Sequence, residues 1–207
     1  MQAMFNAVDP TQIPQEMTFL QLEFWILFSI AVAGKNAKVT EKKMKEFLTP
    51  SQAWNGLEIT HPFETVRMYI EYETLDDELH RAALGKYILL NKAYREVVKL
   101  DLVKLRTEDP NNALARLMKV PGIGPKSARM ILMYAFSHHA NLWAPLDTHI
   151  LHWLRDKGYD APLATPKGKL YSYYEAIFLR EARGRGKTAR ELDTEIWLKY
   201  SGYGEKK

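Results

Sequence analysis

Two residues, Lys126 and Asp147, have the types and positions that covalent chemistry at an electrophilic carbon requires. Lys126 falls in the first turn of a predicted helix, and Asp147 stands where the N-cap of the next helix is expected. A lysine amine attacks carbon only in its neutral form, which burial and a helix N-terminus both favour. An ionised carboxylate at Asp147 can stabilise a developing cation or accept the lysine's proton. The structural alternatives are a plain N-cap at Asp147 and a phosphate contact at Lys126.

The sequence before Lys126 predicts a tight turn between two helices. Gly122 and Gly124 can both take the positive φ angles of a sharp turn, and Ile123 between them can fill the gap between the helices. The backbone N–H groups that follow, including that of Ser127, then point outward at the positive end of a helix. Backbone N–H groups arranged in this way can bind a phosphate oxygen but make no contact with the bases. The turn therefore predicts non-specific DNA binding, and the alternative is an ordinary helical hairpin without a ligand.

Both blocks together resemble the helix-hairpin-helix DNA glycosylase superfamily (HhH-GPD), in particular its endonuclease III branch. Val120-Pro-Gly-Ile-Gly-Pro-Lys-Ser-Ala128 is similar to the branch's Leu-Pro-Gly-Val-Gly-x-Lys-Thr-Ala motif, and Leu146-Asp-Thr-His-Ile150 to its Val-Asp-Thr-His-Val motif. The clear similarity covers residues 85–158. The resemblance implies an all-α fold of two helical lobes, a Schiff-base lysine at Lys126 and the essential aspartate at Asp147. It also implies double-stranded DNA as the partner.

The chain departs from the family in two places. It has no cysteine, so it has no cysteine cluster near its C-terminus to hold iron and sulfur, and we expect a compact member without that cofactor. Lys35 and Asn36 fall where relatives carry a segment that fills the gap left by an extruded base. A positive charge at Lys35 suits an anionic substrate group, which makes this pair a candidate substrate pocket.

Three functions are compatible with these features. The leading one is a DNA glycosylase with abasic-site lyase activity, in which Lys126 attacks the sugar C1′ of an extruded damaged or modified nucleotide. The second is a phage DNA hypermodification enzyme resembling the α-glutamyl/putrescinyl thymine pyrophosphorylase group. Such an amino-acid:DNA transferase places an amino acid or amine on pyrophosphorylated 5-hydroxymethyluracil in DNA. The third is a non-catalytic DNA-binding module that uses the hairpin alone.

Composition limits the class of protein. The 207 residues are 46% hydrophobic and 26% charged, with a formal net charge of +4, which is typical of a globular chain and compatible with an anionic partner. His149 and His152 lack a third ligand at zinc spacing, so no metal and no other cofactor is expected. The longest apolar stretch, residues 24–33, is too short to span a bilayer. We therefore expect a monomer that works in the cytoplasm, on the bacterial nucleoid or in a phage-infected cell, without membrane contact.

Helical periodicity dominates the chain and predicts an all-α glycosylase-like fold. Residues 1–207 are expected to form a single unit, with residues 18–35 and 160–207 in one lobe and residues 40–158 in the helix-hairpin-helix lobe. Thr18 and Gln21 predict a capping box for the first helix, and Thr40 is expected to begin the second. The remaining helices are predicted over residues 62–70, 74–84, 87–100, 112–119, 125–136, 148–157, 171–182 and 188–200.

Overall fold

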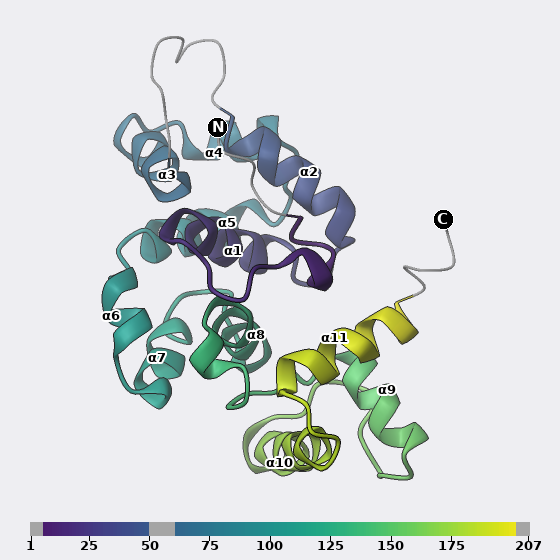
Figure 1. Cartoon of the computed structure of the whole chain (residues 1–207). Helices are drawn as coiled ribbons and strands as arrows, with labels where there is room; N and C mark the ends of the chain where they lie inside the picture. Colours follow the sequence, from purple (N-terminus) through teal and green to yellow (C-terminus); the bar gives the residue numbers. More distant parts are fainter. Residues whose placement is uncertain (1–5, 50–60, 202–207) are drawn as a thin grey trace. The chain divides into compact units, whose positions relative to one another are not determined.

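The computed structural model describes residues 6–49 and 61–201, and these residues form helices and turns without a strand (Figure 1). The all-α prediction is therefore confirmed. The chain divides into two compact units, Met1–Ile123 and Gly124–Lys207. The lobe boundaries expected from the sequence remain a prediction.

The first unit is built around an almost wholly buried helix. Its elements are η1 (Pro10–Gln12), α1 (Phe19–Ala31), α2 (Ala37–Phe47), α3 (Pro62–Glu71), α4 (Leu75–Arg81), α5 (Tyr87–Val97), α6 (Leu102–Thr107) and α7 (Pro110–Leu117). Helix α1 starts with the predicted capping box between Thr18 and Gln21, and ten of its thirteen residues are buried. It packs against α2, α3 and α5, as expected of a helix that is apolar on nearly every side.

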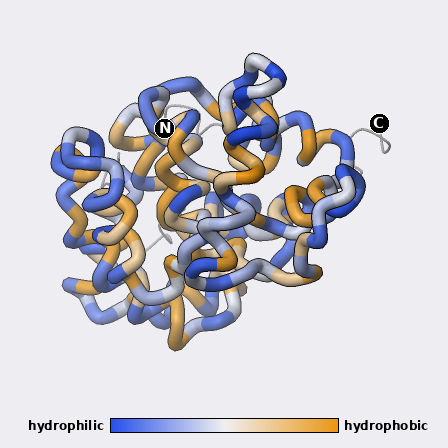
Figure 2. Tube along the Cα trace, turned by 90° about the horizontal axis from the view of Figure 1, so that it is seen from below, coloured by the Kyte–Doolittle hydropathy of each residue, from blue (hydrophilic) through white to orange (hydrophobic). Residues whose placement is uncertain are grey.

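The second unit contains α8 (Pro125–Ala135), η3 (Ser137–His139), α9 (Thr148–Asp156), α10 (Gly168–Gly184) and α11 (Ala189–Tyr200). Helix α11 packs against α8, α9 and α10, and Figure 1 shows it beside α9 and α10. Orange and blue segments alternate along the trace in Figure 2, because most helices bury one face and expose the other. Helix α11 is therefore the element through which the second unit's other helices share a core.

Several predicted boundaries were wrong. Helix α2 begins at Ala37 and not at Thr40, because the Asn36 side chain caps it by accepting a hydrogen bond from Val39 N. Helix α6 was not predicted, since six residues are too few to show a helical period. Helix α10 begins at Gly168 and continues through Gly184, which leaves a shorter loop before α11 than expected.

The hairpin also differs from the expectation of two glycines with positive φ. Gly122 has φ +86°, and a Cβ there would lie 3.2 Å from Ile30 Cγ2, so this position requires glycine. Gly124 instead has φ −90° and ψ 179°, the extended backbone of an N-cap, with open space where a side chain would stand. Ile123 is buried, as predicted for the residue between the two glycines.

Candidate active site

Asp147 is the N-cap of α9, as the sequence predicted. Its Oδ1 accepts hydrogen bonds from His149 N and Ile150 N, each 2.9 Å long, which satisfies two of the free N–H groups at the start of the helix. Its Oδ2 accepts no hydrogen bond from a described residue. One oxygen of Asp147 thus fixes the carboxylate, and the other stays available to a substrate.

The backbone leading into Asp147 is held by side chains from outside the segment. The Tyr171 hydroxyl donates to Ala144 O at 2.8 Å and accepts from Leu146 N at 3.1 Å. Thr165 Oγ1 donates to Leu146 O at 3.0 Å. Burial raises the pKa of Tyr171 well above its usual range, so this group keeps its proton and its donor role. The segment before Asp147 is therefore fixed at two successive positions.

An ion pair between two helices adds a third attachment. Glu175 on α10 accepts from Ala144 N at 2.9 Å and forms two hydrogen bonds with Arg129 on α8. The Arg129 guanidinium also lies over the Trp143 and Tyr171 rings, at 5.4 and 4.4 Å from their centroids. Arg129 follows Lys126 by one helical turn, so the same buried pair links the helix that carries Lys126 to the segment that carries Asp147.

Lys126 lies in the first turn of α8, where the sequence placed it. Its side chain is half-buried and donates no hydrogen bond to a described residue, so its amine is available to a ligand. The backbone N–H groups of Gly124, Lys126 and Ser127 also lack described protein acceptors, since the first bond of this helix runs from Ala128 N to Gly124 O. The start of α8 therefore offers both an amine and a set of free amide donors.

A third ionisable residue, Asp193 on α11, completes the group and was not found from the sequence. It is buried, and its Oδ2 accepts a 2.6 Å hydrogen bond from the Tyr134 hydroxyl of α8. Burial and the negative charge of Asp147 raise the pKa of Asp193 to about 7, although the Tyr134 hydrogen bond and the charge of Lys126 act in the opposite direction. The charges of Lys126 and Asp147 therefore both act on the Asp193 carboxyl within the second unit.

A sequence signal for Asp193 exists. The Thr188 and Glu191 capping box marks the start of α11, and Asp193 falls at the same helical face as the buried Ala189 and Ile196. An acid on the inward face of an amphipathic helix is unusual, because burying a carboxyl is costly unless it is paired or protonated. That pattern singles out Asp193 as a candidate functional residue.

Lys35 and Asn36 belong to the first unit, between α1 and α2. Asn36 caps α2, and the Lys35 amine donates to Leu84 O. Lys43 donates to Ala83 O at 2.7 Å, and Lys86 donates to Ala33 O at 2.6 Å. Burial and the charges of Lys86 and Lys43 lower the pKa of Lys35. These three lysines form a cationic cluster that joins two turns of the first unit.

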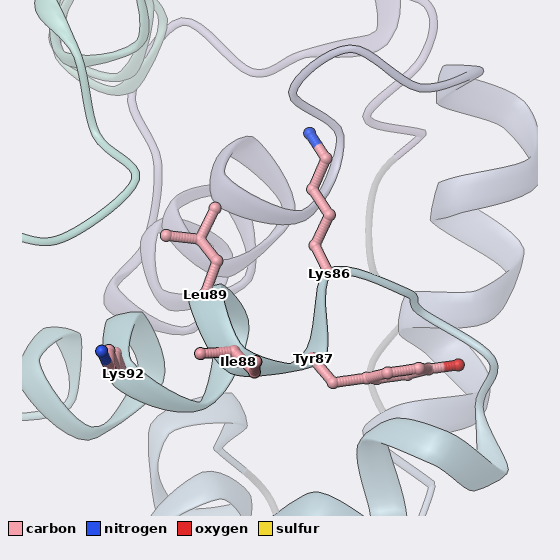
Figure 3. A pocket seen from close by; sticks show the side chains of 5 residues that line it. All are labelled: Lys86, Tyr87, Ile88, Leu89 and Lys92. Carbon is pink, nitrogen blue, oxygen red and sulfur yellow. The ribbon is translucent and has the colours of Figure 1, made fainter.

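A hollow of about 630 Å³ lies beside this cluster at the start of α5. It is lined by Lys86, Tyr87, Ile88, Leu89 and Lys92 (Figure 3). The Lys86 side chain points away from Tyr87, and the Ile88 side chain is 78% exposed. The hollow is therefore an open surface feature with apolar and cationic walls.

No set of three His, Cys, Asp or Glu side chains suited to a metal ion occurs within residues 6–49 and 61–201. His152 instead lies 3.6 Å from Asp156, and its ring packs against Tyr200. None of the helices in the described ranges combines the length and the apolar character that a bilayer span requires.

Solved structures of other proteins share the fold of this chain. No model of a protein family matches the sequence. The chain is similar to the crystal structure of the 8-oxoguanine DNA glycosylase of Thermotoga maritima, with a TM-score of 0.68 and 20% identity over 95% of this chain and 87% of that one. It is also similar to the Clostridium acetobutylicum 8-oxoguanine glycosylase/lyase in complex with DNA, with a TM-score of 0.60 and 14% identity over 88% of this chain and 60% of that one. The chain therefore has the all-helical fold of the helix-hairpin-helix (HhH-GPD) DNA glycosylases.

Proposed function

We propose that the protein is a DNA glycosylase with abasic-site lyase activity, in which Lys126 is the nucleophile and Asp147 its electrostatic partner. The observation that carries the proposal is the start of α8, where the half-buried Lys126 has an amine without a described hydrogen-bond partner beside free amide donors. The same unit holds Asp147, the N-cap of α9, which has one carboxylate oxygen free of described hydrogen bonds. Structural neighbours named as glycosylase/lyases support the same class. Because both neighbours are named for 8-oxoguanine, that base is the first substrate to test.

In this reaction, the Lys126 amine forms a bond to the sugar C1′ while the glycosidic bond breaks and its electron pair leaves with the base. The free oxygen of Asp147 faces the positive charge that develops on the sugar, which lowers the energy of the transition state. Opening of the sugar ring gives an imine with Lys126, and loss of the C2′ proton then expels the 3′ phosphate. Strand cleavage by elimination follows from the same covalent intermediate.

DNA binding is assigned to the hairpin residues Gly122, Ile123 and Gly124 and to the first turn of α8 at Lys126 and Ser127. Free N–H groups at a helix N-terminus suit a phosphate oxygen, because the helix dipole and the unpaired donors act together. Contacts of this type position the duplex without reading its sequence. Recognition of the damaged base must then come from other side chains.

The test is borohydride trapping on duplexes that contain either 8-oxoguanine or an abasic site. The wild type is expected to form a covalent adduct, and Lys126→Ala is expected to lose it. Lys169→Ala is the matched control, since Lys169 is an exposed lysine of α10 in the same unit. Absence of an adduct with the wild type, or its persistence in Lys126→Ala, would refute the Schiff-base mechanism.

The cationic cluster in the first unit favours a second candidate, the amino-acid:DNA transferase. Lys35, Lys43 and Lys86 concentrate positive charge that suits a pyrophosphate leaving group. Incubation with DNA carrying pyrophosphorylated 5-hydroxymethyluracil and with amino acids would then increase the nucleoside mass. An unchanged mass would exclude this function.

The third function, a non-catalytic DNA-binding module, makes a different prediction for the same variants. Lys126→Ala and Asp147→Asn would change only the DNA affinity and its salt dependence. Loss of adduct formation with retained binding would exclude it.

A further inference from the structure

The cationic cluster of the first unit lacks a counter-charge within the described chain. The amines of Lys35, Lys43 and Lys86 each donate to a backbone carbonyl. None of them forms an ion pair with an acid in residues 6–49 or 61–201. Like charges repel one another, so holding these ammonium groups together costs free energy unless an anion binds beside them.

Two turns of the first unit fix the amines at neighbouring positions. Lys35, in the turn after α1, donates to Leu84 O in the turn after α4. Lys86 donates in the opposite direction, to Ala33 O at 2.6 Å. Lys43, on α2, donates at 2.7 Å to the carbonyl directly before that of Leu84. An ammonium group has three N–H donors, so each amine keeps donors for a ligand after its bond to the chain.

The position of Lys86 adds to the concentration of positive charge. Lys86 is the N-cap of α5, with φ +53° and ψ 36°, and no side chain forms a capping hydrogen bond at this helix start. Ser, Thr, Asp and Asn are favoured at an N-cap, and the positive end of a helix dipole disfavours a cation. A lysine in the left-handed conformation at this place is therefore unfavourable for stability unless an anion neutralises it.

The hollow at the start of α5 continues the same cationic surface. Lys86 and Lys92 both line it, on either side of the exposed Ile88 (Figure 3). Lys92 is exposed and forms no hydrogen bond with a described residue. Leu89 also lines the hollow, and its Cδ1 would lie 3.5 Å from a Cβ at Gly122. The hollow is therefore next to the hairpin glycine of the same unit.

We propose that the cationic cluster and Lys92 bind phosphates of one DNA strand, which crosses the hollow at the start of α5. This contact is separate from the hairpin and adds to it. Hydrogen bonds from ammonium groups to phosphate are charge-assisted, and the apolar side chains of Ile88 and Leu89 suit the sugars between the phosphates. The inference rests on the DNA binding proposed above and does not depend on the chemistry of Lys126.

Two observations favour a backbone phosphate over an anionic group carried by the substrate base. Lys86 and Lys92 are exposed on an open surface, whereas an extruded base is held in a closely fitting pocket. The surface also continues to Gly122, which belongs to the hairpin assigned above to a phosphate contact. Both features match a strand that runs along the protein surface.

The experiment is the salt dependence of binding to an unmodified duplex, measured by fluorescence anisotropy over a series of KCl concentrations. The logarithm of the binding constant falls with the logarithm of the salt concentration, by about 0.9 for each phosphate neutralised. Lys86→Gln and Lys92→Gln are each expected to weaken binding and to make this slope less steep by about one. Lys42→Gln is the matched control, since it removes one charge from an exposed lysine of α2 outside the cluster, and it is expected to keep the wild-type slope.

Lys86→Arg and urea unfolding distinguish binding from a structural role. Arginine keeps the charge, so Lys86→Arg is expected to keep the wild-type slope. If Lys86 serves only to join the two turns, Lys86→Gln lowers stability and leaves the slope equal to that of Lys42→Gln, which would overturn the inference. Should Lys86→Gln fail to fold by circular dichroism, Lys92→Gln decides alone, because Lys92 joins no other described element. An unchanged slope in that variant overturns the inference.

The outcomes also separate this inference from the function on which it rests. If the wild type does not bind duplex DNA, both fail. If the wild type binds DNA and forms the trapped adduct but the lysine variants keep its slope, only this inference fails. A loss of affinity confined to a duplex with pyrophosphorylated 5-hydroxymethyluracil would assign the lysines to the substrate base, and it would likewise overturn the backbone contact.

Discussion

Arg129 of α8 and Glu175 of α10 are joined by two hydrogen bonds, 2.7 Å from Nε to Oε1 and 3.0 Å from Nη2 to Oε2. Both side chains are about nine-tenths buried, and Glu175 also holds Ala144 N in the segment that leads to Asp147. Glu175→Gln leaves the Arg129 charge buried without its counter-ion. We expect the free energy of unfolding to fall by roughly 3 kcal/mol, as for other buried pairs that lose one partner.

Urea unfolding measures this loss, and trapping of the adduct measures its effect on the site. Because the segment before Asp147 loses a charged attachment, adduct formation is expected to slow even where the variant remains folded. Glu195→Gln breaks the exposed pair with Lys187 and is expected to cost less than about 1 kcal/mol. Equal losses for the two variants would contradict the structural role of Glu175.

Asp147 combines a capping role with a charge, and two substitutions separate them. Asn is as good an N-cap as Asp, so Asp147→Asn is expected to keep the stability of the wild type. Asp147→Ala removes the side-chain acceptor for His149 N and Ile150 N and is expected to cost about 1 kcal/mol. Both variants lose the carboxylate charge, so both are expected to slow adduct formation about 100-fold or more.

Unfolding curves and single-turnover trapping on the same preparations test this pair. An Asp147→Asn variant that forms the adduct at the wild-type rate would show that Asp147 is a cap alone. A slow but stable Asp147→Asn variant would assign the charge to catalysis.

Local chemistry explains which features the sequence could predict. The capping box at Thr18, the proline at the start of α8 and the cap at Asp147 each depend on neighbouring residues, and the structure confirms all three. The start of α2 was wrong because both Asn36 and Thr40 are acceptable caps, and only the fold decides between them. The sequence therefore predicted the start of a helix correctly where a single residue was suited to cap it.

The residues of the candidate site also fall into those that a short motif marks and those that only the packing of the helices brings together. Lys126 and Asp147 lie in short motifs, so their positions on helices could be predicted, whereas their chemical roles stay proposals. Asp193 and the pair of Arg129 with Glu175 depend on how helices distant in sequence pack within the second unit. Helical periodicity predicts that a residue faces inward but not which residue it meets, and these contacts were therefore missed.

The two hairpin glycines are expected to respond differently to alanine. Gly122→Ala places a Cβ on a backbone with φ +86° and against Ile30 Cγ2, so the variant is expected to lose about 1 to 2 kcal/mol of stability. Gly124→Ala meets open space on an extended backbone and is expected to stay within about 0.5 kcal/mol of the wild type. A methyl group at Gly124 would nevertheless approach a phosphate seated on the first turn of α8.

We therefore expect Gly124→Ala to bind duplex DNA more weakly at unchanged stability. Fluorescence anisotropy with a labelled duplex at two salt concentrations, alongside urea unfolding, checks both properties. Unchanged DNA affinity in Gly124→Ala would argue against a phosphate seat at this helix start.

Asp193 is expected to make stability depend on pH. Burial and the Asp147 charge raise its pKa from 3.8 to about 7 in the folded chain. Between these values the folded chain keeps a proton that the unfolded chain has released, so stability falls as the pH rises through this window. Below it both states are protonated, and above it both are ionised, so the full penalty is present from about pH 7 upward. At 1.36 kcal/mol per unit of pKa, the penalty has an upper bound of roughly 4 kcal/mol.

Asp193→Asn removes the titrating group while keeping an oxygen that accepts from the Tyr134 hydroxyl. The difference in unfolding free energy, variant minus wild type, is therefore expected to increase from pH 4 to pH 7 and then to level off. Urea unfolding at pH 4, 5.5, 7 and 8 measures it, and groups that titrate alike in both proteins cancel in the difference. Glu195→Gln should give a nearly flat difference, because that carboxylate is exposed. A flat difference for Asp193→Asn as well would mean that folding does not raise the pKa of Asp193.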